Sequence, residues 1–262
     1  MLITCLSGLA FNARKWRIED RRNLQDPRIA KSGLQMQKML ETAAQDVVDA
    51  GPYQNFQVGR PPIVSKMCIS DIIDALVQIR IAHRPQLDYD EVCLHCKRLM
   101  SLSVDLSGLE KHPISADGIN HIITGEPYRT SVLIDDENGE PMELGIGIRF
   151  LRGEDIPIIA QHHRQNPTKS HEVALVRHVT SIRKPDGETL TEFMDIWKFF
   201  GKADLSLHEE LDNIISDLEG GIDTSIDAEC EFCLAEQQHT VPFTVPFFYP
   251  RKSKRRSSTV NL

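Results

Sequence analysis

The sequence lacks the features that would attach the chain to a membrane or send it into a secretory route. No apolar run approaches the roughly 20 residues that a membrane-spanning helix needs. The short apolar run in MLITCLSGLAF is followed, not preceded, by positive charge, which is the reverse of a secretory signal. We therefore expect a cytoplasmic protein, whose thiols stay reduced.

Motifs of the common catalytic mechanisms are also absent. The sequence contains no H-E-x-x-H and no G-x-S-x-G. The stretch GIGIRF has Phe150 where a dinucleotide-binding loop would have its third glycine, and DDENGE lacks the spacing of a calcium loop. We expect no enzymatic activity, no catalytic residue and no organic cofactor.

Histidines supply the one alternative to this expectation. A group of them could suggest a metal-dependent hydrolase: His162, His163, His171 and His178. No carboxylate is evidently placed beside them to activate a water. A second bound metal per chain would favour this metalloenzyme.

Positive charge is scarce outside one short segment. The 262 residues include 30 Lys and Arg against 38 Asp and Glu, and five of the cations lie within residues 251–256. The rest of the chain therefore carries 25 cations against 38 anions, a net charge of −13. Because an acidic surface repels phosphates, we expect protein partners and no nucleic acid. Residues 251–262 have too little to bury and are expected to be a disordered basic tail.

Hydrophobic periodicity predicts two helices in the first third of the chain. Apolar side chains at helical spacing favour a helix from about residue 34 to Ala50, where a Gly-Pro dipeptide ends it. The next helix begins at Ser70 or Asp71, either of which is a suitable cap, and ends before Pro85.

A hairpin and a third helix are predicted further along. Apolar and polar residues alternate over 128–151 on both sides of Asn138 and Gly139, which favour a tight reversal. Ser206 begins a capping box at the start of a helix that Gly220 ends.

Two C-x-x-C pairs lie far apart in the chain. Each stands between a strand-like lead-in and a strand-like exit, which predicts a β-hairpin with its cysteines at the bend. Zinc prefers four soft ligands in a tetrahedron, and two intervening residues let both sulfurs of a pair reach one ion. We expect one structural zinc per chain, held by Cys93, Cys96, Cys230 and Cys233.

Other interpretations of the cysteines stay open, namely redox-active or disulfide-bonded pairs and incidental thiols. His95 and His239 lie near the pairs, but four thiolates already fill the coordination sphere, so these rings are expected to be exposed or behind the ligands. Cys5 and Cys68 have no such neighbours and are expected to be buried small apolar residues.

These elements predict an α+β fold with helices packed around a composite zinc-ribbon-like unit. The ribbon is assembled from residues 88–106 and 226–250. A mainly helical N-terminal region, 1–87, precedes it, an inserted α+β region, 107–225, interrupts it, and the basic tail, 251–262, ends the chain. Closing so long a loop costs only a few RT more than closing a short one, whereas a structural zinc contributes on the order of 10 kcal/mol.

The order of several segments is similar to that of a known family. CLSGLAFNARKWRIED, MCISDIIDALVQIRIAHRP, LDYDEVCLHCKRLMSLSVDLSGL and CEFCLAEQQHTVPFTVPFFYPR resemble the T-even-type bacteriophage base plate protein family over nearly the whole chain. Its members are described as baseplate hub assembly proteins or tail assembly chaperones. All four cysteines stand where the family pattern places them, and the basic tail after Pro250 lies beyond that pattern.

The resemblance implies a non-enzymatic part in building the hub of a contractile tail, as an assembly chaperone or as a retained hub subunit. The partners would be baseplate hub and tape-measure proteins, with no membrane and with an oligomer in the assembled hub as an option. The location would be the host cytoplasm during assembly and the virion tail baseplate if the protein is retained. The alternative is a zinc-ribbon nucleic-acid-binding or regulatory module, which salt-sensitive DNA binding would support.

Overall fold

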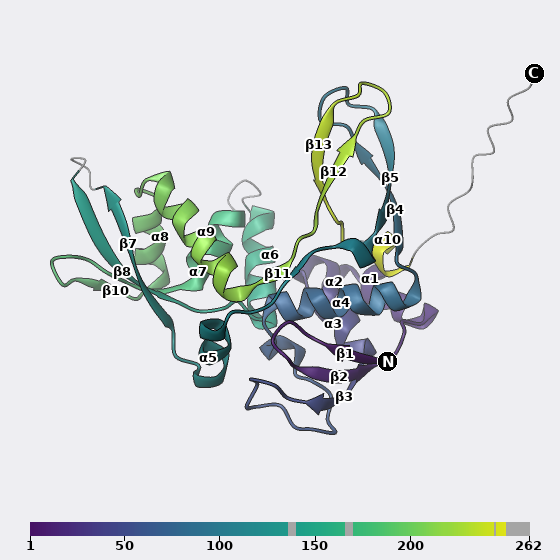
Figure 1. Cartoon of the computed structure of the whole chain (residues 1–262), viewed down its shortest axis with the longest axis horizontal. Helices are drawn as coiled ribbons and strands as arrows, with labels where there is room; N and C mark the ends of the chain where they lie inside the picture. Colours follow the sequence, from purple (N-terminus) through teal and green to yellow (C-terminus); the bar gives the residue numbers. More distant parts are fainter. Residues whose placement is uncertain (136–139, 166–169, 244, 250–262) are drawn as a thin grey trace, which may run out of the picture. The chain divides into compact units, whose positions relative to one another are not determined.

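The computed structural model describes residues 1–262 except 136–139, 166–169, 244 and 250–262. Helices and strands are both present, which confirms the mixed α+β class (Figure 1). The basic tail and the reversal expected at Asn138 and Gly139 lie outside the described residues.

The chain divides into two compact units. The larger unit contains Met1–Leu76 and Lys111–Ile222, and the smaller contains Val77–Glu110 and the chain from Asp223 onward. Most of the N-terminal region and most of the inserted region expected from the sequence therefore belong to one unit, whereas residues 77–87 belong to the smaller unit. Residues 111–222 form an excursion between the two halves of the smaller unit.

The N-terminal part of the larger unit contains a three-stranded antiparallel sheet as well as helices. Its strands, in the order β1-β2-β3, are Leu2–Thr4, Ala10–Ala13 and Ala44–Asp49. The helical segments between β2 and β3 are η1 Ile18–Arg21, α1 Arg22–Gln25, α2 Pro27–Ser32 and α3 Gln35–Ala43.

The helix predicted from about residue 34 to Ala50 is therefore wrong in its second half. Helix α3 ends at Ala43, and the chain continues directly into strand β3. Val47 and Val48 fit the helical spacing, but β-branched residues also suit a strand. Phe11 of β2 pairs with Val47, which is buried, so tertiary pairing overrides the local pattern.

Helix α4, Ile69–His83, has nearly the extent predicted, and η2, Val64–Lys66, precedes it. The predicted capping role of Ser70 or Asp71 is wrong, because both lie inside the first turn. Asp71 is fully buried and accepts hydrogen bonds from the Ser7 hydroxyl and the Tyr53 hydroxyl, both at 2.6 Å. Burial raises the pKa of this carboxyl, and these two donors oppose the rise.

The second part of the larger unit is built on a four-stranded antiparallel sheet in the order β10-β9-β8-β7. Its strands are β7 Tyr128–Asp135, β8 Pro141–Ile148, β9 Val179–Arg183 and β10 Thr189–Leu190. The accompanying helices are α5 Ala116–Thr124, η4 Gly153–Asp155, α6 Ile156–Gln165, α7 Ser170–His178, α8 Phe193–Phe200 and α9 Leu205–Glu219. A two-residue pairing of β6, Lys111–His112, with β11, Gly221–Ile222, closes the excursion.

We call residues 128–219 the sheet module. Strands β7 and β8 confirm the predicted hairpin and show that GIGIRF begins in a strand. Helix α9 is capped by Asp204, not by Ser206, and Gly220 follows its last residue as predicted. One face of the sheet packs against α7, α8 and α9, and the core between them is made of fully or nearly buried residues: Val132, Ile134, Leu144, Ile146, Ile148, Leu175, Val176, Val179, Ile182, Ile196, Phe200, Leu207, Leu211 and Ile215.

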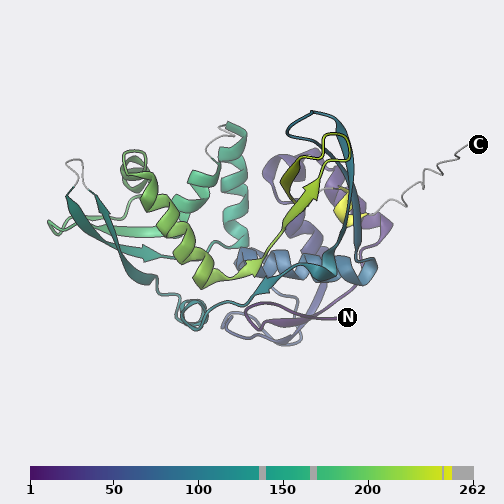
Figure 2. The same ribbon diagram turned by 45° about the horizontal axis from the view of Figure 1, so that its top comes forward.

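The smaller unit contains two separate two-stranded hairpins. They are β4 Gln86–Val92 with β5 Leu99–Asp105, and β12 Ser225–Glu229 with β13 Glu236–Thr240. The short helical segments η3 Leu106–Gly108 and α10 Val245–Phe248 complete the unit. Both predicted hairpins are thus confirmed. In two views their bends lie at the same end of the unit (Figures 1 and 2).

None of the helices in the described part of the chain combines the length and the hydropathy that a bilayer-spanning helix requires.

Candidate metal centre

The bend of the first hairpin has a defined hydrogen-bonding pattern. The Cys93 N–H donates to the carbonyl oxygen of Arg98 at 2.9 Å, and the Lys97 N–H donates back to the Cys93 carbonyl at 3.0 Å. These two bonds close a tight turn that contains the whole C-x-x-C pair.

The second bend repeats the first. The Cys230 N–H donates to the Ala235 carbonyl at 3.0 Å, and the Leu234 N–H donates to the Cys230 carbonyl at 2.9 Å. The residue directly after the second cysteine of each pair has a left-handed backbone, with φ of 61° at Lys97 and 58° at Leu234. Two stretches that share only their cysteines therefore fold into the same turn. The left-handed residues were not foreseen, because neither is the glycine that such a position favours.

The two bends bring the four cysteine sulfurs together. The Sγ atoms of Cys93 and Cys233 are 3.7 Å apart, and those of Cys96 and Cys230 are 3.8 Å apart. All four sulfurs lie within 4.8 Å of one another. A disulfide needs a sulfur–sulfur distance of about 2.05 Å, so these are four free thiols around a common point. Such a group could hold a metal ion.

Burial and backbone donors differ among the four thiols. Cys93 and Cys230 are buried, Cys96 is half-buried and Cys233 is exposed. The backbone N–H groups of Cys96 and His95 donate to the Cys93 sulfur at 3.4 Å and lower the pKa of that thiol to about 6. The Ala235 N–H lowers the pKa of Cys233, but partial desolvation and the three neighbouring thiols outweigh it and raise the pKa to about 11. At neutral pH the group thus offers a ready thiolate at Cys93.

Contacts beyond the sulfurs also join the hairpins. The Leu94 N–H donates to Oε1 of Gln237 at 2.8 Å, and Nε2 of the same amide lies 3.1 Å from the Met100 sulfur. The Arg98 guanidinium lies over the Phe232 ring, 5.2 Å from its centroid. No local pattern could have predicted these pairs, because each joins positions more than 130 residues apart.

The nearby histidines do not join the sulfurs. His95 is exposed, and His239 is buried on β13 with an Nε2 that has no hydrogen-bond partner. Cys5 and Cys68 are buried in the larger unit, as expected, and burial raises the pKa of both thiols.

The four histidines of the alternative interpretation do not form a centre among the described side chains. Burial lowers the pKa of His178 to about 4, and its Nδ1 lies 2.9 Å from the Arg149 carbonyl. The His162 ring lies against Phe193, and the side chain of His171 is outside the description. In the described part of the chain, the four cysteines are the only group of three or more metal-ligating side chains.

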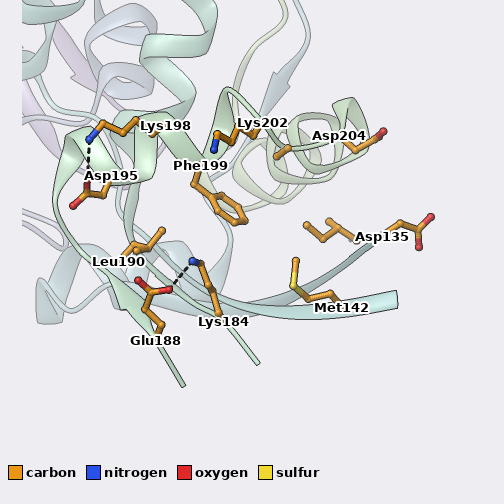
Figure 3. Close-up of a pocket in the computed structure, with 12 residues that line it drawn as sticks. Asp135, Met142, Lys184, Glu188, Leu190, Asp195, Lys198, Phe199, Lys202 and Asp204 are labelled. Carbon is orange, nitrogen blue, oxygen red and sulfur yellow. Dashed lines mark hydrogen bonds and ion pairs between the residues drawn. The ribbon is translucent and has the colours of Figure 1, made fainter. Parts of the chain in front are cut away.

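A cavity of about 840 Å³ lies in the sheet module between the sheet and α8 (Figure 3). Its apolar side chains include Met142, Leu190 and Phe199. Among its charged groups, Lys184 pairs with Glu188 at 2.6 Å and Lys198 with Asp195 at 3.3 Å. Among the described residues that line it there is no histidine, cysteine, serine or tyrosine. The remaining charged side chains, Asp135, Lys202 and Asp204, are of both signs, and the lining selects no particular ligand.

Comparison with protein-family models, with curated proteins and with solved structures yields no match to this chain. The site is therefore interpreted from its own geometry.

Proposed function

We propose that Cys93, Cys96, Cys230 and Cys233 bind one structural zinc ion, and that the protein acts without catalysis in assembling the baseplate hub of a contractile phage tail. The convergence of the four sulfurs is the observation that supports the metal. The resemblance of the sequence to the T-even-type base plate family supports the biological role.

The sulfur distances fit a tetrahedral ion. A zinc–sulfur bond of about 2.3 Å gives a tetrahedron with edges of about 3.8 Å. The sulfur pairs Cys93–Cys233 and Cys96–Cys230, at 3.7 and 3.8 Å, match that edge. Four thiolates suit zinc or iron, and zinc is the proposal because structural four-cysteine sites favour it.

A closed coordination sphere favours a structural role. Catalytic zinc keeps one position open for water or substrate, whereas four cysteines leave none. The ion would join two hairpins that have no strand pairing with each other in the described residues. Its proposed task is to fix the smaller unit in one conformation, so that partner proteins meet a defined surface of this unit.

The charge of the ribbon, which we define as residues 86–105 and 225–240, favours a protein partner over nucleic acid. It carries eight carboxylates against two cations, Lys97 and Arg98. Phosphate backbones would be repelled by such a surface. This supports hub and tape-measure proteins as partners, either during assembly in the host cytoplasm or in the finished baseplate.

A phage whose gene for this protein carries an early stop codon tests the role. We expect infected cells to accumulate heads, filled or empty, without functional contractile tails. Cys93→Ser should largely reproduce the defect, because the ribbon loses its ion. Cys5→Ser, which changes a buried thiol of the larger unit, is the matched control and should support tail assembly. Complete tails together with a failure of transcription or DNA packaging would reject the hub role.

A further inference from the structure

The bends of the ribbon expose an unusual number of apolar side chains. Five large ones, which we call the apolar tip, are between 44% and 69% exposed: Val92, Leu94, Leu99, Phe232 and Leu234. Val92 and Leu99 are directly opposite each other across β4 and β5. Leu94 and Leu234 each follow a cysteine of the pair whose sulfurs are 3.7 Å apart. Both bends therefore contribute to one patch at one end of the unit. Exposed apolar patches of this kind mark interaction sites.

Leu234 is the least expected of the five. Its left-handed backbone disfavours any side chain with a Cβ, and its apolar side chain is 69% exposed. A glycine would remove both costs without changing the turn. Backbone strain of this kind clusters at functional positions, so the observed outlier supports a role for the side chain itself.

An acidic face lies next to the tip. On the β12–β13 hairpin, Glu229 is directly opposite Glu236, and like charges in this arrangement repel. Asp227 lies two residues from Glu229 and hence on the same face. A groove of about 590 Å³ is lined by these three carboxylates together with Ala228 and two glutamines. Among the described residues, none of the three has an ion-pair partner.

We propose that the apolar tip and the acidic face form one docking surface for a segment of a partner protein in which Lys or Arg side chains alternate with apolar ones. The apolar side chains would cover the tip, and the cations would relieve the repulsion between Glu229 and Glu236. This inference rests on the proposed metal-held ribbon, because only the convergence of both bends assembles the tip.

The charge of the docking surface argues against three other occupants: nucleic acids, anionic lipids and a second copy of the chain. Nucleic acids and anionic lipids would meet carboxylates beside the tip, with only Lys97 and Arg98 to attract them. A second copy that docked symmetrically through the same surface would place acidic face against acidic face. A basic, partly apolar segment is complementary to both halves of the surface.

Fluorescence anisotropy with three labelled 12-residue peptides tests the proposal on the full, zinc-loaded chain. One peptide alternates Lys with Leu, the second Lys with Ser, and the third Glu with Leu. We expect the Lys–Leu peptide to bind at least ten-fold more tightly than either of the others. Equal binding of the Lys–Ser peptide would mean that charge alone attracts it, and would overturn the role of the tip.

Three double variants locate the binding. Glu229→Gln with Glu236→Gln should weaken binding of the Lys–Leu peptide at least five-fold, and Leu94→Ser with Phe232→Ser at least ten-fold. The control, Glu209→Gln with Glu210→Gln, removes the same charge from an exposed part of α9 and should leave binding unchanged. An equal loss in the control would overturn the surface.

Two further measurements separate the outcomes. Zinc content is measured in the natural chain and in every variant. Absence of zinc from the natural chain would reject the proposed ribbon, whereas weaker binding by a variant that keeps its zinc is loss of docking. Sedimentation of the full chain is compared with that of Leu94→Ser, Phe232→Ser. A tip-dependent dimer would assign the surface to a second copy. If a chain shortened after Tyr249 bound the peptide ten-fold more tightly, residues 250–262 would be assigned as the occupant of the surface. The tip-dependent dimer and this result would each overturn the proposal of a separate partner protein.

Discussion

The sheet module and the ribbon are both built on antiparallel strands, but different interactions hold them together. In the module, fourteen buried residues form a continuous core between the sheet and its helices. The corresponding cluster of the ribbon has three buried members, Cys93, Met100 and Cys230, and two of them are proposed metal ligands. An isolated two-stranded hairpin is marginal in water. The module can therefore rely on apolar burial, whereas the ribbon would depend on the proposed ion.

Removing the ion is the strongest way to test this difference. Purified protein should contain about one zinc per chain, and Cys93→Ser or Cys230→Ser should abolish it. The double variant should be little worse than either single one, because both act on one site. Hydrogen exchange should show loss of protection in the four strands of the ribbon and not in β7–β9, since a structural zinc contributes on the order of 10 kcal/mol to the region it holds.

Two results would contradict that prediction. Full zinc occupancy in Cys230→Ser would reject a site shared by both hairpins. Loss of zinc in Cys5→Ser, whose thiol donates to the Asp71 carbonyl in the larger unit, would place the metal elsewhere or make its binding depend on the whole fold.

A substitution in the core of the sheet module should destabilise the module and leave the ribbon unchanged. Leu144 on β8 is fully buried, so Leu144→Ala should destabilise the sheet module by about 2–5 kcal/mol while zinc content is unchanged. Leu133 on the neighbouring strand is 70% exposed, and Leu133→Ala should cost less than about 0.5 kcal/mol. Chemical denaturation followed at the Trp197 fluorescence of α8 measures both. Equal effects of the two variants would mean that the core is not where burial places it.

The sheet module and the ribbon should also differ in how their stability depends on pH. Burial, together with the nearby Asp71 charge, raises the pKa of Glu219, the last residue of α9, from 4.5 to about 8, and its Oε1 has no partner. The native state therefore holds this proton more tightly than the unfolded state does. The stabilisation is complete below about pH 4.5 and is lost as the pH rises towards 8, by about 1.4 kcal/mol per pH unit. Metal held by thiolates has the opposite dependence, since acid releases it.

Glu219→Gln tests the sign of this effect. The amide resembles the protonated acid, so the variant should be more stable than the natural protein at pH 9 and nearly equal to it at pH 5. Urea unfolding of both proteins at the two pH values measures the difference. A variant that is less stable at pH 9 would show that Glu219 is ionised and paired in the native state.

The smallest predicted effect concerns the two left-handed residues of the ribbon. Lys97→Gly and Leu234→Gly should each stabilise the ribbon by up to about 1 kcal/mol, because glycine accepts the left-handed backbone without strain. Leu99→Gly, in a strand next to the first bend, should destabilise it. Competition with a chelator for the bound metal ranks the three. Destabilisation by both glycines at the left-handed positions would mean that these side chains make contacts which outweigh the strain.

The two hairpins of the ribbon could be predicted from the sequence because each is a local pattern. Strand-like residues flank a C-x-x-C pair, and the turn follows from a few neighbouring residues. That all four cysteines meet could also be expected, since unpaired half-sites have no comparable stability. The acceptor Gln237 and the stacking of Arg98 on Phe232 could not, because they depend on how two distant turns face each other.

The two predictions that were wrong in the larger unit failed for a similar reason. The spacing of Val47 and Val48 fits a helix as well as a strand, and only the pairing of β3 with β2 decides between them. Asp71 has the residue type of a cap, but its carboxylate is used by Ser7 and Tyr53, which lie 64 and 18 positions away. Local chemistry fixes the available roles of a residue, and tertiary contacts select one of them.

The distance of 140 positions between Cys93 and Cys233 also orders events during synthesis. At the usual 5–20 residues per second, the first pair of thiols waits about 7–28 s on the ribosome before the second pair is made. In that interval the whole sheet module emerges and is free to fold, while a two-cysteine half-site binds metal only weakly. Capture of the proposed ion would therefore be a late step. A chain that stops short of Cys233 keeps open thiols and lacks a ribbon, so metal loading distinguishes finished molecules from unfinished ones.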